Sequence, residues 1–261
     1  MISILLFLRT ALFVLTALFL HEMAHVLAVN YLGGKVEKVG LFPLGFAARF
    51  RGLERLRGWE RYVIYAAGSV ANLIIAGWTF AVSHLSYFRL PWLEEFAFYS
   101  LILCIFNLLP ILPLDGGRIF HQFLSNRIGI IRANRFMLKF GAAAVYLFFV
   151  LGFVQTIFFP FNISLLLAAL YLRQQNKQMK TTLQMDFFCF VDAKKLPSKL
   201  RLMPIRHVTL PPNTQLKFAM ERITIDHFTF FRINEGEKFS EKDLMAQVFK
   251  EGINKRIVNK V

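Results

Sequence analysis

The sequence predicts a mainly α-helical protein: a polytopic membrane helical bundle followed by a small α+β domain at the carboxyl end. Hydrophobic residues make up 56% of the 261 residues and charged residues only 18%, against about 25% in an ordinary soluble domain. The apolar residues form long uncharged runs, and the 31 Lys and Arg fall between them. This composition excludes a disordered chain, a small disulfide scaffold and a typical cytosolic enzyme.

The uncharged runs predict about five membrane spans, since a bilayer needs about 20 apolar residues per helix. In the first run the only formal charge is Glu22, and we expect no cleavable signal peptide there because no small-residue cleavage site follows. The last run is too long for one helix and is interrupted at Phe159-Pro160-Phe161-Asn162, so we expect two short helices joined there. The runs cover residues 10–34, 62–88, 96–114 and 140–172.

The distribution of basic residues predicts the orientation of these spans. With five spans, the loops 35–61 and 116–139 lie on the same side as everything after residue 173. These two loops hold 12 Lys and Arg, whereas the other side holds only Arg9 and Arg89. The positive-inside rule therefore places the two loops and the basic tail in the cytoplasm.

We expect three parts in the chain: a transmembrane domain at 1–176, a linker at 177–201 and a small cytoplasmic domain at 202–261. After residue 172 the chain has 17 basic and 9 acidic residues. Its pattern predicts strand, helix, strand and helix. The second helix should open with a capping box at Ser240-Glu241-Lys242-Asp243 and run to about Lys250.

A metal-binding pattern lies within the first apolar run. His21-Glu22-Met23-Ala24-His25 has the form HExxH. Residues four apart share one face of a helix, so the two imidazoles can hold one zinc ion while Glu22 takes a proton from the attacking water. The alternative is that both histidines are surface or capping residues. Two His and one Glu are costly within an apolar helix unless they pair or bind something, which favours the metal.

Asp115 is the candidate third ligand that a catalytic zinc site requires. It ends an apolar run on the predicted cytoplasmic side, within Leu114-Asp115-Gly116-Gly117. The Gly pair allows a sharp turn that directs the carboxylate inward. The alternative is that Asp115 is an ordinary turn residue, because Asp-Gly is common in turns.

The HExxH helix and the segment Asn107-Leu108-Leu109-Pro110-Ile111-Leu112-Pro113-Leu114-Asp115-Gly116 together resemble the site-2 protease family of intramembrane zinc metalloproteases. The resemblance implies that His21, His25 and Asp115 ligate Zn2+ and that Glu22 is the general base. Asn107 and Pro113 match residues of the family that contact substrate. The implied partners are a membrane-associated protein substrate and the lipid bilayer.

Two further segments resemble elements of the family. Ala67-Gly68-Ser69-Val70-Ala71-Asn72 looks like its Ala-Gly-Pro-x-x-Asn element, with Ser69 in place of Pro. Asn72 could therefore orient the substrate or polarise the scissile carbonyl, and a hydrogen bond between helices is an equal alternative. Val36 to Phe50 fits a membrane-inserted hairpin that pairs with an extended substrate by strand addition.

The tail resembles a single, divergent cystathionine-β-synthase (CBS) motif, which implies a regulatory domain. Ser240 and Asp243 match the positions that hold a nucleotide ribose, so ATP or another adenine nucleotide is the implied ligand, with a capping box alone as the favoured alternative. One motif is half of the usual pair. Its apolar sheet face should be covered by Phe187, Phe188 and Phe190 of the linker or by a second copy of the chain, as a homo-oligomer.

A protease core followed by one such motif resembles the sporulation branch of the family. The resemblance implies the pro-segment of the sigma-K precursor as substrate, inhibitory membrane proteins as regulators, and a multi-pass location in the mother-cell membrane around the forespore. The alternatives are a CBS-bearing site-2 protease with another transmembrane substrate, a metal-ion transporter and a non-catalytic scaffold. Direct nucleic-acid binding is not expected despite the pI of about 10.1. The basic residues alternate with long apolar runs, as they do in membrane proteins whose positive charges mark one side of the bilayer.

Overall fold

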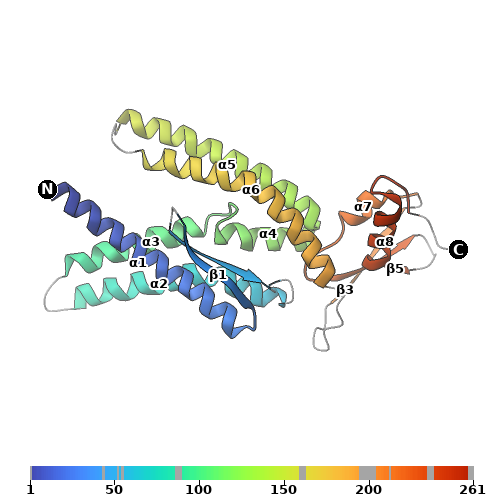
Figure 1. Cartoon of the computed structure of the whole chain (residues 1–261), viewed down its shortest axis with the longest axis horizontal. Helices are drawn as coiled ribbons and strands as arrows, with labels where there is room; N and C mark the ends of the chain where they lie inside the picture. Colours follow the sequence, from blue (N-terminus) through green and yellow to red (C-terminus); the bar gives the residue numbers. More distant parts are fainter. Residues whose placement is uncertain are drawn as a thin grey trace. The chain divides into compact units, whose positions relative to one another are not determined.

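The computed structural model (Figure 1) describes residues 2–42, 45–51, 53, 56–85, 90–158, 163–193, 204–211, 213–233 and 238–257. Helices account for most of these residues, as predicted. The chain divides into two compact units. One comprises residues 1–110 and 114–119, and the other comprises residues 111–113 and 120–261.

The first unit is built on three helices, α1 (Ile2–Tyr31), α2 (Gly58–Leu85) and α3 (Pro91–Asn107), each packed against the other two. It also contains the first turn of α4 (Asp115–Ile128). Polar pairs join the helices at one end. Arg9 on α1 lies 2.7 Å from the Glu95 carboxylate on α3, and the Ser83 hydroxyl on α2 donates to Glu94 Oε1 at 3.0 Å.

A β-hairpin connects α1 to α2, as the sequence predicts for Val36 to Phe50. Its strands β1 (Lys35–Phe42) and β2 (Gly45–Arg51) pair antiparallel from Lys35↔Arg51 to Phe42↔Gly45. Val36 and Phe50 pack against the buried side chains of Val29 and Ile64, on α1 and α2. The hairpin is therefore anchored to both helices, while its insertion into a membrane stays a prediction.

Three described helices are long and apolar enough to cross a membrane: Phe7–Tyr31, Gly58–Leu85 and Ile130–Phe158. Large apolar side chains on them, such as Leu12, Trp78 and Phe153, are exposed, which fits contact with lipid. The other two expected crossings coincide with α3, which has 17 residues, and α6 (Ser164–Ala193), which continues into a polar half. The count of five spans thus stays a prediction beyond these three.

Two helices are present where the sequence predicts two short ones within 140–172, but the predicted length is wrong. Helices α5 (Ile130–Phe158) and α6 have 29 and 30 residues and run side by side (Figure 1). The segments that flank the apolar run, 130–139 and 173–193, carry charged residues but no Pro or Gly, so no helix breaker ends either helix at the edge of the apolar run. The predicted turn at 159–162 lies outside the described residues, between the two helices.

Residues 177–193 of the predicted linker are helical, as the end of α6. The remaining linker residues, 194–201, lie outside the described residues. The predicted domain boundaries themselves stay a prediction.

The tail has the predicted order of strand, helix, strand and helix, with one additional short strand. Strand β3 (Ile205–Leu210) pairs parallel with β4 (Phe228–Ile233), which pairs antiparallel with β5 (Lys238–Ser240). Helix α7 (Leu216–Met220) connects the parallel pair, and α8 (Glu241–Glu251) follows β5. The predicted capping box is confirmed: Asp243 N–H donates to Ser240 Oγ, and Ser240 N–H donates to Asp243 Oδ2 at 2.9 Å.

The core of the tail includes the end of α6. Phe187 and Val191 are buried in one cluster with β3, β4, α7 and α8, and Phe190 packs against it. Phe188 is half exposed. Phe187 and Phe190 therefore cover part of the apolar surface of the tail, while covering by a second copy of the chain stays a prediction.

A polar network fixes the turn after α7 against the beginning of α5. Ile130 N–H donates to the Ile223 carbonyl at 2.9 Å, and the buried Glu221 carboxylate accepts from Arg132 Nε at 3.0 Å and from Arg135. Burial alone would raise the pKa of Glu221, but the hydrogen bonds and charges of Arg132 and Arg135 outweigh it and hold the pKa below its usual value.

We expect Glu221→Gln to lower the free energy of unfolding of the tail by about 1 kcal/mol at pH 7, a value reduced because both arginines are partly exposed. The carboxylate contributes fully above its unfolded-state pKa of about 4.3, and this contribution is lost as the pH falls toward its lower folded-state pKa. Hydrogen exchange on the full chain, measured from pH 7 downward, should show this loss in the wild type. Exposed Glu251→Gln is the control, and an unchanged pH dependence in Glu221→Gln would contradict the prediction.

Candidate metal centre

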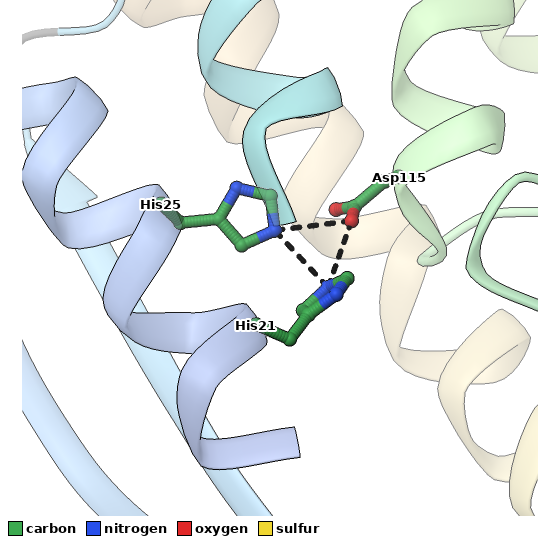
Figure 2. Close-up of side chains that lie close together, drawn as sticks. All are labelled: His21, His25 and Asp115. Carbon is green, nitrogen blue, oxygen red and sulfur yellow. Dashed lines mark hydrogen bonds and ion pairs between the residues drawn. The ribbon is translucent and has the colours of Figure 1, made fainter. Parts of the chain in front are cut away.

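His21, His25 and Asp115 meet in one buried cluster (Figure 2). The histidines lie one turn apart on α1, and Asp115 is the first residue of α4. Each histidine Nε2 lies 3.0 Å from Asp115 Oδ2, and the two Nε2 atoms are 3.2 Å apart. All three residues are at least 90% buried. The structure therefore brings the two histidines of α1 together with an aspartate that follows His25 by 90 residues.

The chain turn before α4 places Asp115 toward the histidines. Helix α3 ends at Asn107, and α4 begins eight residues later. Gly116 makes the close approach possible, because a Cβ at this position would collide with the Leu108 carbonyl. A carboxylate in the first turn of a helix is also stabilised by the helix dipole.

Helix α2 contacts the Nδ1 atoms of both histidines. The Ile64 carbonyl lies 2.7 Å from His25 Nδ1, and the Asn72 amide nitrogen lies 3.1 Å from His21 Nδ1. Gly68 lies between them, and a Cβ there would collide with the Nε2 atoms of both histidines. These three α2 residues are spaced by four and so form one stripe along the helix.

The sequence predicts no role for Ile64, and it predicts Gly68 only as a member of the segment 67–72. Gly68 lies one helical turn before Asn72, and this spacing could have indicated that the glycine belongs to the same site. Ile64 acts through its backbone carbonyl. Any residue type supplies a backbone carbonyl, so the sequence contains no signal for this contact.

The three ligating atoms fit a zinc ion. Bonds of about 2.0–2.1 Å in tetrahedral geometry place ligand atoms about 3.3 Å apart, and the observed separations are 3.0, 3.0 and 3.2 Å. Two imidazole nitrogens and one carboxylate oxygen are donors that zinc accepts. The bond from His25 Nδ1–H to the Ile64 carbonyl leaves the Nε2 lone pair free for a metal.

The other predicted site residues have their own positions. Glu22 follows His21 on α1 and is half-buried. The Asn107 amide donates to the Leu103 carbonyl of its own helix at 3.0 Å, and Pro113 lies in the turn before Asp115. Ser240 and Asp243 pair with each other at 2.7 Å. The roles predicted for these residues in catalysis, substrate binding and nucleotide binding stay predictions.

The hairpin passes beside the metal cluster. The Phe50 ring of β2 lies 6.5 Å from the His25 ring, centroid to centroid. Phe50 also packs with Val29 and Ile64, which belong to the helices that hold the histidines. This end of β2 therefore lies close to His25.

Apolar helices of membrane-spanning length and a buried His-His-Asp cluster define the candidate metal centre of an integral membrane protein. Residues 9–94 and 90–153 match the model of Peptidase family M50, which is more than half of the chain. The chain belongs to this family.

Two curated relatives and one solved structure give the range of similarity. The chain is 28% identical over 155 residues to the zinc metalloprotease MJ0392 of Methanocaldococcus jannaschii, covering 58% of this chain and 43% of that protein. It is 25% identical over 131 residues to stage IV sporulation protein FB of Bacillus subtilis, covering 50% and 46%. The site-2 protease structure from Methanocaldococcus jannaschii superposes with a TM-score of 0.54 at 25% identity, over 65% of this chain and 76% of that one.

These matches confirm the family that the sequence motifs predict and the protease fold of the membrane part. The chain spans less than half the length of the curated relatives that it matches.

Proposed function

We propose that this chain is an intramembrane zinc metalloendopeptidase that hydrolyses a peptide bond of a membrane-associated substrate. The observation that supports the proposal is the buried cluster of His21, His25 and Asp115 among apolar helices, in a chain of family M50. Their atoms are spaced for zinc, and the HExxH glutamate lies next to the first ligand.

Each residue of the cluster has a distinct task in this proposal. His21, His25 and Asp115 hold the zinc ion, which when bound supplies Lewis-acid activation of water and of the scissile carbonyl. Glu22 accepts the proton of the attacking water and donates it to the leaving amine. Asp115 also balances part of the positive charge within a buried site. The surrounding helices restrict the access of bulk water.

The hairpin is the proposed docking element for the substrate. A helical substrate hides its carbonyls, so the segment to be cut has to be extended. Among the described residues β1 pairs only with β2, so each strand has an outer edge at which an extended peptide can add as a further strand. Phe50 brings β2 next to His25, which connects this edge to the metal cluster.

The proposed substrate is the pro-segment of a sigma-K-type precursor in the mother-cell membrane around the forespore, with inhibitory membrane proteins as regulators. The support is the sequence similarity to stage IV sporulation protein FB together with a tail of the predicted element order. Another transmembrane substrate is the alternative, because other matched relatives are named zinc metalloprotease or putative zinc metalloprotease, with no link to sporulation in their names.

A cleavage assay with the purified full chain in lipid nanodiscs tests the function. A sigma-K-type precursor and an unrelated single-span membrane protein serve as substrates, and fragments are identified by mass spectrometry. We expect cleavage of the precursor that stops on zinc chelation and returns when zinc is added. Cleavage of the unrelated protein alone would favour the alternative substrate, and zinc-independent cleavage of both would contradict the proposal.

The tail is proposed as a CBS-like regulatory domain that binds an adenine nucleotide, in a chain that forms homo-oligomers. Its net charge of +8 favours a phosphate-bearing ligand. Ser240 and Asp243 already satisfy each other as a capping box, so a nucleotide has to add to this pair. The same assay with and without ATP tests the regulation, since an unchanged rate with no bound ATP would reduce the tail to a stabilising domain.

We expect a reporter fused after Lys177 to be cytoplasmic and one inserted near Arg89 to be external. The physical reason is the distribution of basic residues, 12 on one side and 2 on the other, which orients membrane helices. The two fusions are compared in the same cells by paired cytoplasmic and external reporters. An external signal at Lys177 would mean that residues 140–172 cross the membrane only once.

A further inference from the structure

The Asn72 side chain is fully buried against the first candidate ligand. Its Nδ2 lies 3.1 Å from His21 Nδ1, and the residue has no exposed surface. Two roles are predicted for Asn72, one toward the substrate and one in a hydrogen bond between helices, and its contact with His21 of α1 is a hydrogen bond of the second kind. Asn72 also lies on the α2 stripe that contains Ile64, whose carbonyl holds His25 in the corresponding way.

The proton on His21 decides what Asn72 can do. The amide nitrogen only donates, so in the observed pair His21 Nδ1 accepts and the ring proton belongs to Nε2, which faces Asp115 Oδ2 at 3.0 Å. A neutral imidazole that ligates through Nε2 keeps its proton on Nδ1 instead. Nδ1 then becomes a buried donor and requires an acceptor.

Asn72 can supply this acceptor by turning its amide over. Its Oδ1 is buried without a hydrogen-bond partner among the described residues, so the present orientation rests on the single bond to His21. A half-turn about the Cβ–Cγ bond exchanges Oδ1 and Nδ2 and places the oxygen against Nδ1–H. The side chain keeps its shape in this motion, so the packing of α1 on α2 is unchanged.

We propose that Asn72 is the positioning residue of His21: its amide oxygen accepts the Nδ1 proton and so directs the Nε2 lone pair to the zinc ion. This inference rests on the proposed function, since it assumes a metal at the cluster. Ile64 does the same for His25 through a backbone carbonyl that no side-chain substitution removes. Of these two hydrogen-bond partners of the histidines, only the Asn72 side chain can be removed by mutation.

Zinc retention by the full chain in detergent micelles tests the proposal without any substrate. Asn72→Leu removes the acceptor, and Asn72→Asp keeps an acceptor oxygen in the same place. Thr79→Val is the matched control, because Thr79 is a buried α2 residue whose hydroxyl, among the described residues, donates to the Ile75 and Ala76 carbonyls of its own helix. Each protein is loaded with zinc and titrated with a competing chelator.

We expect Asn72→Leu to bind zinc about 10–100-fold more weakly, the usual loss when the hydrogen-bond partner of a metal-bound histidine is removed. Asn72→Asp and Thr79→Val should bind as the wild type does or more tightly. Equal zinc affinity in Asn72→Leu and the wild type would overturn the proposal. So would an Asn72→Asp variant that loses zinc as strongly as Asn72→Leu.

Nitrogen NMR of ¹⁵N-histidine-labelled wild type and Asn72→Asp gives a second readout that does not depend on Asn72→Leu folding. In the zinc-loaded protein the proton of the His21 ring should be on Nδ1, and its resonance should move downfield in Asn72→Asp. A proton on Nε2 would overturn the proposal. A chain that passes both tests but cuts no substrate would contradict the proposed protease and leave the role of Asn72 intact.

Discussion

Glu22→Gln is expected to lower the rate of peptide cleavage by about 10²–10⁴-fold, the contribution typical of a general base. Glutamine has nearly the same shape but cannot take a proton from water. Glu22 lies between the two histidines in sequence, and the three candidate ligands form their cluster without it. Zinc content and membrane insertion should therefore stay at the wild-type level, while single-turnover cleavage measured on the precursor falls.

Asp115→Ala is the matched comparison for Glu22→Gln. It removes a ligand, so zinc content should fall together with the rate. The two variants thus separate a loss of proton transfer from a loss of the metal. Cleavage by Glu22→Gln at the wild-type rate would exclude Glu22 as the base, and full zinc occupancy with normal turnover in Asp115→Ala would mean that the third ligand is another residue.

The sequence predicts the metal cluster well because its signals are local. His21 and His25 are spaced for one helix face, and the cost of polar residues in an apolar helix favours a metal. Asp115 is 90 residues away from His25 in sequence, and it is predicted as the third ligand because it ends an apolar run on the predicted cytoplasmic side in a turn that directs its carboxylate inward. The structure confirms that these three residues come together.

The sequence predicts helix ends less well where membrane and soluble parts meet. An uncharged run measures how far a chain can lie in lipid, and a helix continues for as long as its backbone can. Residues 173–193 include charged residues but no Pro or Gly, so α6 runs from the apolar segment into the predicted linker. Its Phe187 then completes the core of the tail, which no local pattern indicates.

The support that α2 gives the cluster could not be predicted because it depends on how two helices face each other. Ile64 contributes a backbone carbonyl, and Gly68 contributes the absence of a side chain. Asn72 was predicted as a functional residue, but its contact with His21 follows only from the packed structure. Gly68 and Asn72, the first and last residues of the Gly-Ser-Val-Ala-Asn segment, are thus explained by their contacts with the histidines of α1.

Gly68→Ala tests this packing with the smallest change that the chain allows. A Cβ at residue 68 would lie 2.6 Å from His21 Nε2 and collide with His25 Nε2, where the zinc ion has to approach both atoms. One of the two rings has to move, and we expect zinc affinity to fall at least about a hundredfold, at the upper end of the effect of residues around metal ligands. Cleavage should fall with zinc occupancy.

Gly77→Ala on the same helix is the control for this experiment. A Cβ at Gly77 meets no atom within 4 Å, so the variant gains only the higher helix propensity of alanine, about 1 kcal/mol. Both variants receive this gain, and therefore a loss of zinc in Gly68→Ala alone reports the collision with the histidines. Metal analysis and thermal unfolding are measured on both proteins. If Gly68→Ala binds zinc and cleaves as Gly77→Ala does, then α2 does not approach the histidines as closely as described, and the arrangement of α1 and α2 around the site is wrong.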